Sequence, residues 1–378
     1  MSHQGPALSE SRTPAWKILV PAGVAEIALL AAAGWWPGHA PGWLFLTLGI
    51  LAFGAYAAAA LRIKDAQGGG LLVWGVAILL RLVLVPLAPE MSADVYRYLW
   101  DGHIQLNGMN PLRYAPVDPA LAALRTSWFS FLPSTETLSP YPPVAQMAFL
   151  ALSVVGGTVF QAKLLWLGFD LATGWVLGRI AAFTGRSRRL TQLLYLWSPL
   201  LVVEVAWNAQ MAPMALFALA LVVLLARAPV SAGAMGALST LVAPVPLVAL
   251  PPLTARLGRR FLVGFVAVLV VLTVPYASAG LGLFDGILDY VHSARIMAGG
   301  FTLLESVAPG RSLPLLLAFL LLAAVSIGVA VQRFRPERAL LWTVGAVLLL
   351  TPAFRPHYAL WILPLAALRV SVPWILFT

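Results

Sequence analysis

The hydrophobic positions of the chain fall into long runs that are separated by short polar turns. A helix that crosses a bilayer needs about 20 predominantly apolar residues, within a range of roughly 17–25. Seven runs are long enough or nearly so: residues 18–36, 43–61, 71–87, 159–183, 190–206, 261–276 and 313–331. Three further runs are less regular: residues 212–226, 339–350 and the last run from Tyr358.

Proline interrupts this pattern between residues 230 and 257. Because Pro244, Pro246, Pro251 and Pro252 break any continuous helix, the segment predicts two short helices that turn back on each other. With these included, the pattern predicts an all-α polytopic membrane protein of about 12 transmembrane helices. Since no polar block is long enough to fold separately, we expect one integral-membrane domain over residues 1–378.

Composition supports a membrane environment for the chain. It is 61% hydrophobic and only 10% charged, with a mean hydropathy of +0.89, whereas soluble domains carry about 25% charged residues. The net charge of +10 comes from basic residues in short loops. This placement is typical of the positive-inside rule, so we expect no nucleic-acid partner. There is no cysteine, which excludes disulfides, thiolate metal sites and cysteine nucleophiles.

The basic residues also predict an orientation. With the N-terminus inside, 14 of the 24 Lys and Arg residues fall in cytoplasmic loops and six fall outside. Both termini are then cytoplasmic. The apolar segment 144–155 is too short to cross, so we expect it to lie in the outer interface.

Two long loops lie on the outer side in this scheme, at residues 89–143 and 277–312. Long loops in a compact fold usually carry function. Eight of the 14 acidic residues lie in these two loops. We therefore expect the chemistry of the protein on the outer face.

The first outer loop begins with a predicted helix. Ser92 is a plausible N-cap, and the helix should run to about Leu106. Asp94 and Asp101 are seven residues apart, so both carboxylates share one helix face, with Arg97 and Tyr98 between them. In isolation such acids are more often solvated charges or partners of an arginine.

The motifs Asp94-Val-Tyr-Arg-Tyr-Leu-Trp-Asp-Gly, Asn110-Pro-Leu-Arg-Tyr-Ala-Pro and Tyr141-Pro-Pro-Val-Ala-Gln resemble the first outer loop of GT-C glycosyltransferases. The nearest branch is the bacterial polyprenyl-phosphate-mannose-dependent mannosyltransferases. Two later segments, Ser198-Pro-Leu-Leu-Val-Val-Glu and Thr351-Pro-Ala-Phe-Arg-Pro-His-Tyr, add to the resemblance. It implies an enzyme of the bacterial inner membrane that transfers a hexose, with mannose favoured, from a polyprenyl-phosphate-sugar donor to a lipid or glycan acceptor.

The resemblance also implies roles for particular residues. Asp94 takes the place of the catalytic acid, and chemically it would act as the general base that deprotonates the acceptor hydroxyl. Arginine suits a phosphate because its guanidinium binds bidentately and stays charged. The candidate substrate-binding residues are Arg97, Tyr98, Asp101, Tyr141, Gln146, Glu204, Asn208, Arg295, Arg355 and His357. No cofactor or metal motif is evident, although Asp94 and Asp101 could share a cation if their side chains converge.

Other interpretations of the sequence remain open. The chain could be a lipid or sugar transporter, although its polar residues gather in outer loops and not at the midplane. It could also be a non-catalytic membrane partner derived from the same fold.

Two ion pairs can also be expected from the sequence. Within the apolar runs, Glu26–Arg81 is one possible ion pair. Arg355 could simply pair with an acid of the second outer loop, such as Asp289 or Glu305.

Overall fold

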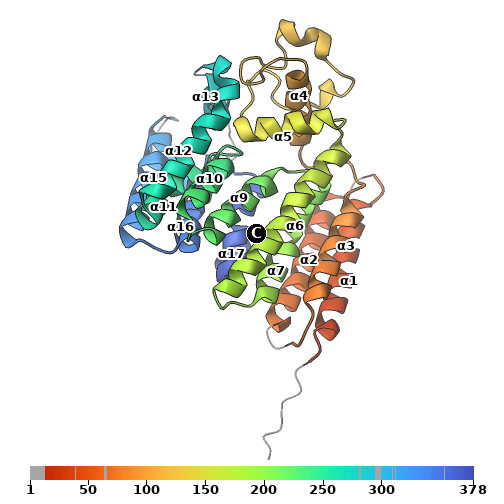
Figure 1. Cartoon of the computed structure of the whole chain (residues 1–378). Helices are drawn as coiled ribbons and strands as arrows, with labels where there is room; N and C mark the ends of the chain where they lie inside the picture. The colour runs from red at the N-terminus through yellow and green to blue at the C-terminus, as the bar shows by residue number, and fades with distance from the viewer. Residues whose placement is uncertain are drawn as a thin grey trace, which may run out of the picture.

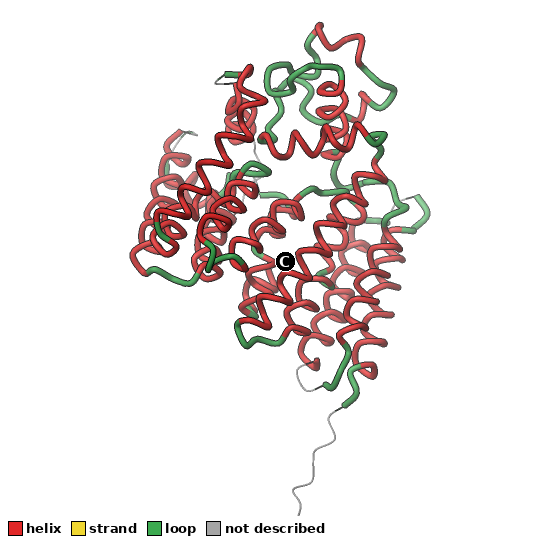
Figure 2. Tube along the Cα trace, in the orientation of Figure 1, coloured by secondary structure: helices red, strands yellow, loops and turns green. Residues whose placement is uncertain are grey.

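The computed structural model describes residues 13–38, 40–63, 66–280, 282–293, 299–308, 310, 312–352 and 354–378. Every regular element in this part of the chain is helical (Figure 2). The all-α fold class predicted by the apolar runs is therefore confirmed.

The long helices form two groups (Figure 1). The first contains α1 (Trp16–Gly34), α2 (Gly42–Arg62), α3 (Gly70–Leu84), α6 (Val159–Phe183) and α7 (Arg188–Leu196). The second contains α10 (Pro229–Thr240), α11 (Leu250–Leu257), α12 (Arg259–Thr273), α15 (Ser312–Gln332) and α16 (Pro336–Leu350). Two helices contact both groups: α9 (Ala212–Leu224) and α17 (Leu363–Arg369).

A third layer covers one end of the helix groups. It contains α4 (Asp94–Leu106), α5 (Pro143–Val154) and α13 (Gly282–Ser293), together with the loop between α4 and α5. Figure 1 shows α5 lying across the end of α6 rather than along the bundle. The N–H groups of Val144 and Ala145 donate to the Leu241 carbonyl at the end of α10, which holds α5 in this position. Segment 144–155 therefore lies across the helix groups; its predicted place in the outer interface stays a prediction.

Five helices in the described residues are long and apolar enough to cross a membrane: Trp16–Gly34, Gly42–Arg62, Val159–Phe183, Arg259–Ala279 and Ser312–Gln332. A sixth span results if Arg188–Leu196 and Pro199–Trp207, which meet at a 51° bend, are counted together. Exposed apolar side chains such as Leu46, Val271 and Phe319 cover these helices. The helices indicate an integral membrane protein.

The expected count of about 12 crossings is not confirmed by these helices. Breaks at proline leave several apolar helices short, such as α3 with 15 residues and α9 with 13. A 15-residue helix is only about 22 Å long, against a hydrocarbon thickness of about 30 Å. The predicted pair of short helices between residues 230 and 257 is present, as α10 and the Val245–Leu257 helix.

Charges inside the first helix group are paired differently from the expectation. Arg81 donates from Nε to Asp170 Oδ2 at 2.6 Å and from Nη1 to the carbonyls of Ala77 and Leu196. The carboxylate of Glu26 is buried and has no hydrogen-bond partner in the part of the chain that the structure describes. The predicted Glu26–Arg81 ion pair is therefore wrong, because Arg81 pairs with Asp170 on α6 and the described contacts show no ion pair between Arg81 and Glu26.

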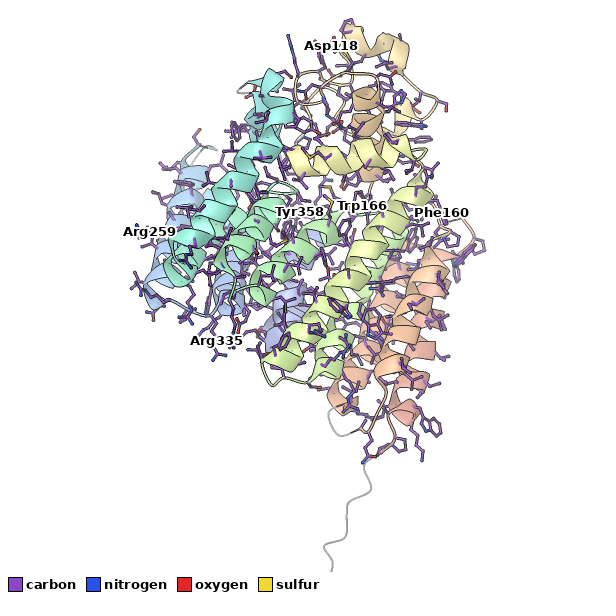
Figure 3. The ribbon with its side chains drawn as sticks, viewed as in Figure 1. Asp118, Phe160, Trp166, Arg259, Arg335 and Tyr358 are labelled. Atoms are coloured by element: carbon purple, nitrogen blue, oxygen red, sulfur yellow. The ribbon has the colours of Figure 1, made fainter. Side chains whose placement is uncertain are left out.

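Basic residues of two separate loops lie together at one end of the molecule. Arg186 in the α6–α7 loop pairs with Glu337 at the start of α16 at 3.4 Å, so two of the basic loops lie at the same end. Figure 3 shows Arg335 at that end and Asp118 of the α4–α5 loop at the other. The α6–α7 loop and the start of α16 thus lie at the end of the helix groups opposite the α4–α5 loop.

Candidate functional site

Asp94 lines a cavity of about 230 Å³ where the third layer meets the helix groups. The walls come from α4, the turn at residues 140–142, residues 210–212, α13 and the segment between α16 and α17. Figure 3 labels Tyr358, one of its lining residues, between the two helix groups and below the third layer. Aromatic side chains line much of this Asp94 cavity: Tyr98, Tyr141, Tyr290, His357, Tyr358 and Trp361.

Asp94 is the first residue of α4 and its side chain is 13% exposed. Ser92 accepts a hydrogen bond from the Asp94 N–H at 3.3 Å, although the residue at the N-cap position is Ala93. A carboxylate in the first turn is favoured by the partial positive charge of the helix N-terminus. Its Oδ2 accepts a hydrogen bond from Gln210 Nε2 at 3.1 Å, and its Oδ1 lies 3.6 Å from Arg355 Nη1.

Arg355 approaches Asp94 from the far end of the sequence. Pro356 begins a short helical turn, Pro356–Trp361 (η7), and Arg355 lies just before it in an extended conformation. The ion pair that Arg355 makes is with Asp94, and the described contacts show none with Asp289 or Glu305. The Arg355 side chain is still 40% exposed. Burial would lower the pKa of Arg355, but Asp94 raises it above its ordinary value.

His357 lies on the same turn and carries no charge at neutral pH. Burial lowers the pKa of His357 to about 4, with Asp94 opposing the shift and Arg355 adding to it. The cation beside Asp94 at neutral pH is therefore the guanidinium of Arg355. A neutral imidazole can still offer a hydrogen-bond donor or acceptor to a ligand in the cavity.

Tyr98 and Tyr141 form one wall of the Asp94 cavity. Their rings are 5.2 Å apart in an edge arrangement, and Tyr98 stacks on Phe149 of α5 at 4.8 Å. Burial raises the pKa of both tyrosines well above the ordinary value, so both phenols stay protonated. The structure places both predicted residues at the cavity, as rigid aromatic surfaces next to the carboxylate.

Arg97, Asp101 and Gln146 lie in a buried network away from the cavity lining. Arg97 Nε donates to Asp101 Oδ1 at 2.9 Å, and Gln146 Nε2 donates to Asp101 Oδ2 at 3.0 Å. The guanidinium also donates to the carbonyls of Ser134 and Thr137. This network, which we call the loop clasp, ties the α4–α5 loop to α4 and α5. Asp94 and Asp101 therefore do not converge on one cation.

A second cavity of about 780 Å³ lies on the other side of the Arg355–His357 turn. Its walls are mostly apolar side chains of α1, α2, α8 (Pro199–Val202) and α18 (Val372–Phe377). Ser92, Glu204, Arg355 and His357 form its polar part. Arg355 and His357 line both cavities, so this apolar cavity and the Asp94 cavity meet at one cation.

Glu204 and Asn208 belong to an irregular stretch that follows α8. Residues Val203–Trp207 (η4) form a π-helical turn, a feature often found at functional sites. Glu204 lines the apolar cavity, close enough to Asp94 for an electrostatic interaction. Asn208 is buried, and its Oδ1 accepts from the Met91 N–H at 3.2 Å. Asn208 therefore holds the backbone before Asp94 and does not line either cavity.

Arg295 lies outside the described residues. The sequence motifs missed Gln210, Tyr290 and Tyr358 as cavity residues. Tyr358 stands within the late motif and could have been included, but Tyr290 has no local sequence signal because α13 brings it to the cavity. Among the described residues, no group of three or more His, Asp or Glu side chains is placed to hold a metal ion.

Comparisons of the chain with protein-family models, with curated proteins and with solved structures found no match.

Proposed function

We propose that the chain is a membrane glycosyltransferase that moves a hexose from a polyprenyl-phosphate-sugar donor to a hydroxyl of a lipid or glycan acceptor. The observation that carries this proposal is the meeting of two cavities at Arg355, with a carboxylate on the Asp94 side. A phosphate bound by Arg355 would have an apolar cavity on one side and an aromatic, carboxylate-bearing cavity on the other.

Each part of the proposed donor has a chemically suited region. The apolar cavity suits a prenyl chain, since its walls are mainly aliphatic and aromatic side chains. Arg355 suits the phosphate, because a partly exposed guanidinium can bind it bidentately. The tyrosine-lined Asp94 cavity suits a sugar ring, which presents apolar C–H faces and polar edges.

In the reaction, Asp94 takes the proton of the acceptor hydroxyl while that oxygen bonds to the anomeric carbon of the sugar. The bond between this carbon and the phosphate oxygen breaks, and its electron pair leaves with the polyprenyl phosphate. Arg355 stabilises the negative charge of the leaving phosphate. A positioned general base contributes about 10²–10⁴ in rate. The residues proposed for this step are Asp94 as base and Arg355 as phosphate ligand.

The proposal includes the wider architecture implied by the resemblance: a GT-C-like fold with about 12 crossings in a bacterial inner membrane, cytoplasmic termini and an outer active site. The basic loops at the end opposite α4 support this orientation. A transporter is the second candidate, because the two cavities together could take a whole lipid-linked sugar.

Purified protein in nanodiscs, given polyprenyl-phosphate mannose with a radiolabelled sugar, tests the proposal. The acceptor is a lipid or glycan extract of a bacterial envelope. A new labelled product that forms in proportion to protein supports a transferase. Movement of intact donor between leaflets of proteoliposomes, without any labelled product, would establish the transporter instead.

A further inference from the structure

Among the described residues, Gln210 is the hydrogen-bond donor to the side chain of Asp94. Its Nε2 donates to Asp94 Oδ2 at 3.1 Å and to Ser92 Oγ at 2.9 Å. Its Oε1 accepts from the Tyr98 hydroxyl at 3.2 Å. Gln210 is only 3% exposed, so these contacts are shielded from water.

The backbone around Gln210 is shaped to bring this amide to Asp94. The N–H of Gln210 donates to the Glu204 carbonyl at 2.9 Å, which closes the turn after the π-helical stretch. Ala209 adopts a left-handed conformation with φ 57°, which costs a non-glycine residue free energy. Strain of this kind persists only where surrounding contacts hold it, and it often marks a functional site.

The same turn holds the chain that leads to Asp94 at three successive points. Trp207 Nε1 donates to the Ala88 carbonyl at 2.9 Å, and Asn208 accepts from the Met91 N–H. Gln210 then contacts Ser92 and Asp94. The turn therefore fixes the position of the backbone at the start of α4.

The orientation of the amide follows from its neighbours. A phenol that keeps its proton donates to Oε1, which directs the NH₂ group to Ser92 and Asp94. Oδ2 of Asp94 is then occupied. Oδ1 lies 3.6 Å from Arg355 Nη1, which is beyond hydrogen-bond distance, and no hydrogen bond to it is seen among the described residues, so its lone pairs are available to a ligand in the cavity.

We propose that Gln210 is the positioning residue of the site: by holding Oδ2, it makes Oδ1 the atom of Asp94 that accepts the proton of the acceptor hydroxyl. This inference rests on the proposed transferase function. It assigns Gln210 a role through Asp94, with no direct contact to the reacting atoms. Ser92 and Tyr98 act one step further away, because they fix the amide of Gln210.

Gln210→Glu tests the role through the pH dependence of transfer. A second carboxylate beside Asp94 disfavours the ionised base, so the rising limb of the rate against pH should move up by about 1–2 pH units. Gln210→Met keeps the size and removes the donor. Its kcat should fall about 10-fold while KM for the donor stays within about twofold, as expected when only the transition state loses an interaction.

Gln192→Met is the matched control. Gln192 is equally buried and donates from Nε2 to the Gly174 carbonyl inside the first helix group, away from both cavities. Gln192→Met should match Gln210→Met in any general loss of stability and leave the pH profile in place. An unshifted rising limb in folded Gln210→Glu overturns the inference.

Carbodiimide labelling of Asp94, followed by mass spectrometry, separates the two levels of the argument. Only a protonated carboxyl reacts, so the pH midpoint of labelling reports the protonation of this residue without any sugar transfer. The midpoint should move up by about 1–2 pH units in Gln210→Glu. A shifted midpoint in a protein that transfers no sugar would refute the transferase function alone. An unchanged midpoint would refute the role of Gln210, whether or not the wild type transfers sugar.

Discussion

At the scale of single residues, the site depends on one carboxylate with two different neighbours. Asp94 has a neutral amide on one oxygen and a guanidinium 3.6 Å from the other. The amide is buried, whereas Arg355 is 40% exposed and can turn towards a ligand. A partly exposed cation beside a base that is held by a buried amide suits a reaction in which a phosphate leaves while a proton is removed.

Replacing Arg355 with glutamine should weaken binding of polyprenyl phosphate, with no sugar attached, by about 10- to 100-fold. The estimate corresponds to losing one charge-assisted hydrogen bond, about 1.5–3 kcal/mol. Binding can be followed by microscale thermophoresis in detergent. Thermal stability should hardly change, because the side chain is partly exposed and makes only a loose pair. Arg113→Gln, on the exposed α4–α5 loop, is the control and should bind normally. Unchanged affinity in folded Arg355→Gln would remove Arg355 from the donor site.

At the scale of elements, the loop clasp holds the α4–α5 loop against α4 and α5. Arg97 and Asp101 are both almost fully buried, and the guanidinium holds two carbonyls of the loop. Trp100 and Ile104, on α4 as well, form a small separate core with Leu121 and Leu132 of the loop. One face of α4 therefore packs against the loop, and the first residue of the helix, Asp94, lines the cavity.

Asp101→Asn should destabilise the protein by about 3 kcal/mol, because it leaves the Arg97 charge buried without its counter-ion. The expected readouts are a lower midpoint of thermal unfolding and faster proteolysis between residues 107 and 142. Asp118→Asn is the control on the same loop, since asparagine can also accept the hydrogen bond from Ala120. Normal stability together with lost donor affinity in Asp101→Asn would instead support the substrate-binding role that the sequence predicts.

The elements that the sequence predicted well are those set by local patterns. Apolar runs located α1, α2, α6, α12 and α15 within a few residues, and proline located the short helices after α9. The helix from Asp94 to Leu106 was also predicted, because its spacing of polar and apolar residues is a local feature, but the predicted N-cap Ser92 is wrong, since Ala93 occupies that position.

Long-range contacts could not be predicted in the same way. Asp94 and Asp101 do share a helix face, but the clasp covers only the second of them, which depends on how the loop folds back. The pairing of Arg81 with Asp170 in place of Glu26 depends on how α3 packs against α6. Gln210 was not singled out because its role requires a π-helical turn and a left-handed alanine, and periodicity predicts neither.

At the scale of the whole molecule, the proposed function requires Asp94 and the basic loops to lie on opposite sides of the membrane. The 25-residue helix α6 connects the third layer to the α6–α7 loop and is about 37 Å long, enough to cross. Because α5 lies across its end, the α4–α5 loop stays on the side where α6 begins.

Single cysteines at Thr135 and Ser187 should therefore react with membrane-impermeant maleimide from opposite sides, Thr135 from the outside of intact cells. The natural chain has no cysteine, so each variant carries one thiol. Labelling after permeabilisation is the control for reactivity. Labelling of both sites from one side would contradict the orientation and place the Asp94 cavity on the cytoplasmic face or the α6–α7 loop outside.

Sugar transfer by Asp94→Asn tests the central claim most directly. The substitution keeps the shape of the side chain and removes its basicity, so transfer from polyprenyl-phosphate mannose should fall at least about 10²-fold, in line with the loss of a general base. Donor binding and thermal stability should persist, and Asp285→Asn, an exposed acid of α13, should transfer normally. A folded Asp94→Asn protein that transfers sugar at the wild-type rate would contradict the account, because no base would then be acting at this carboxylate.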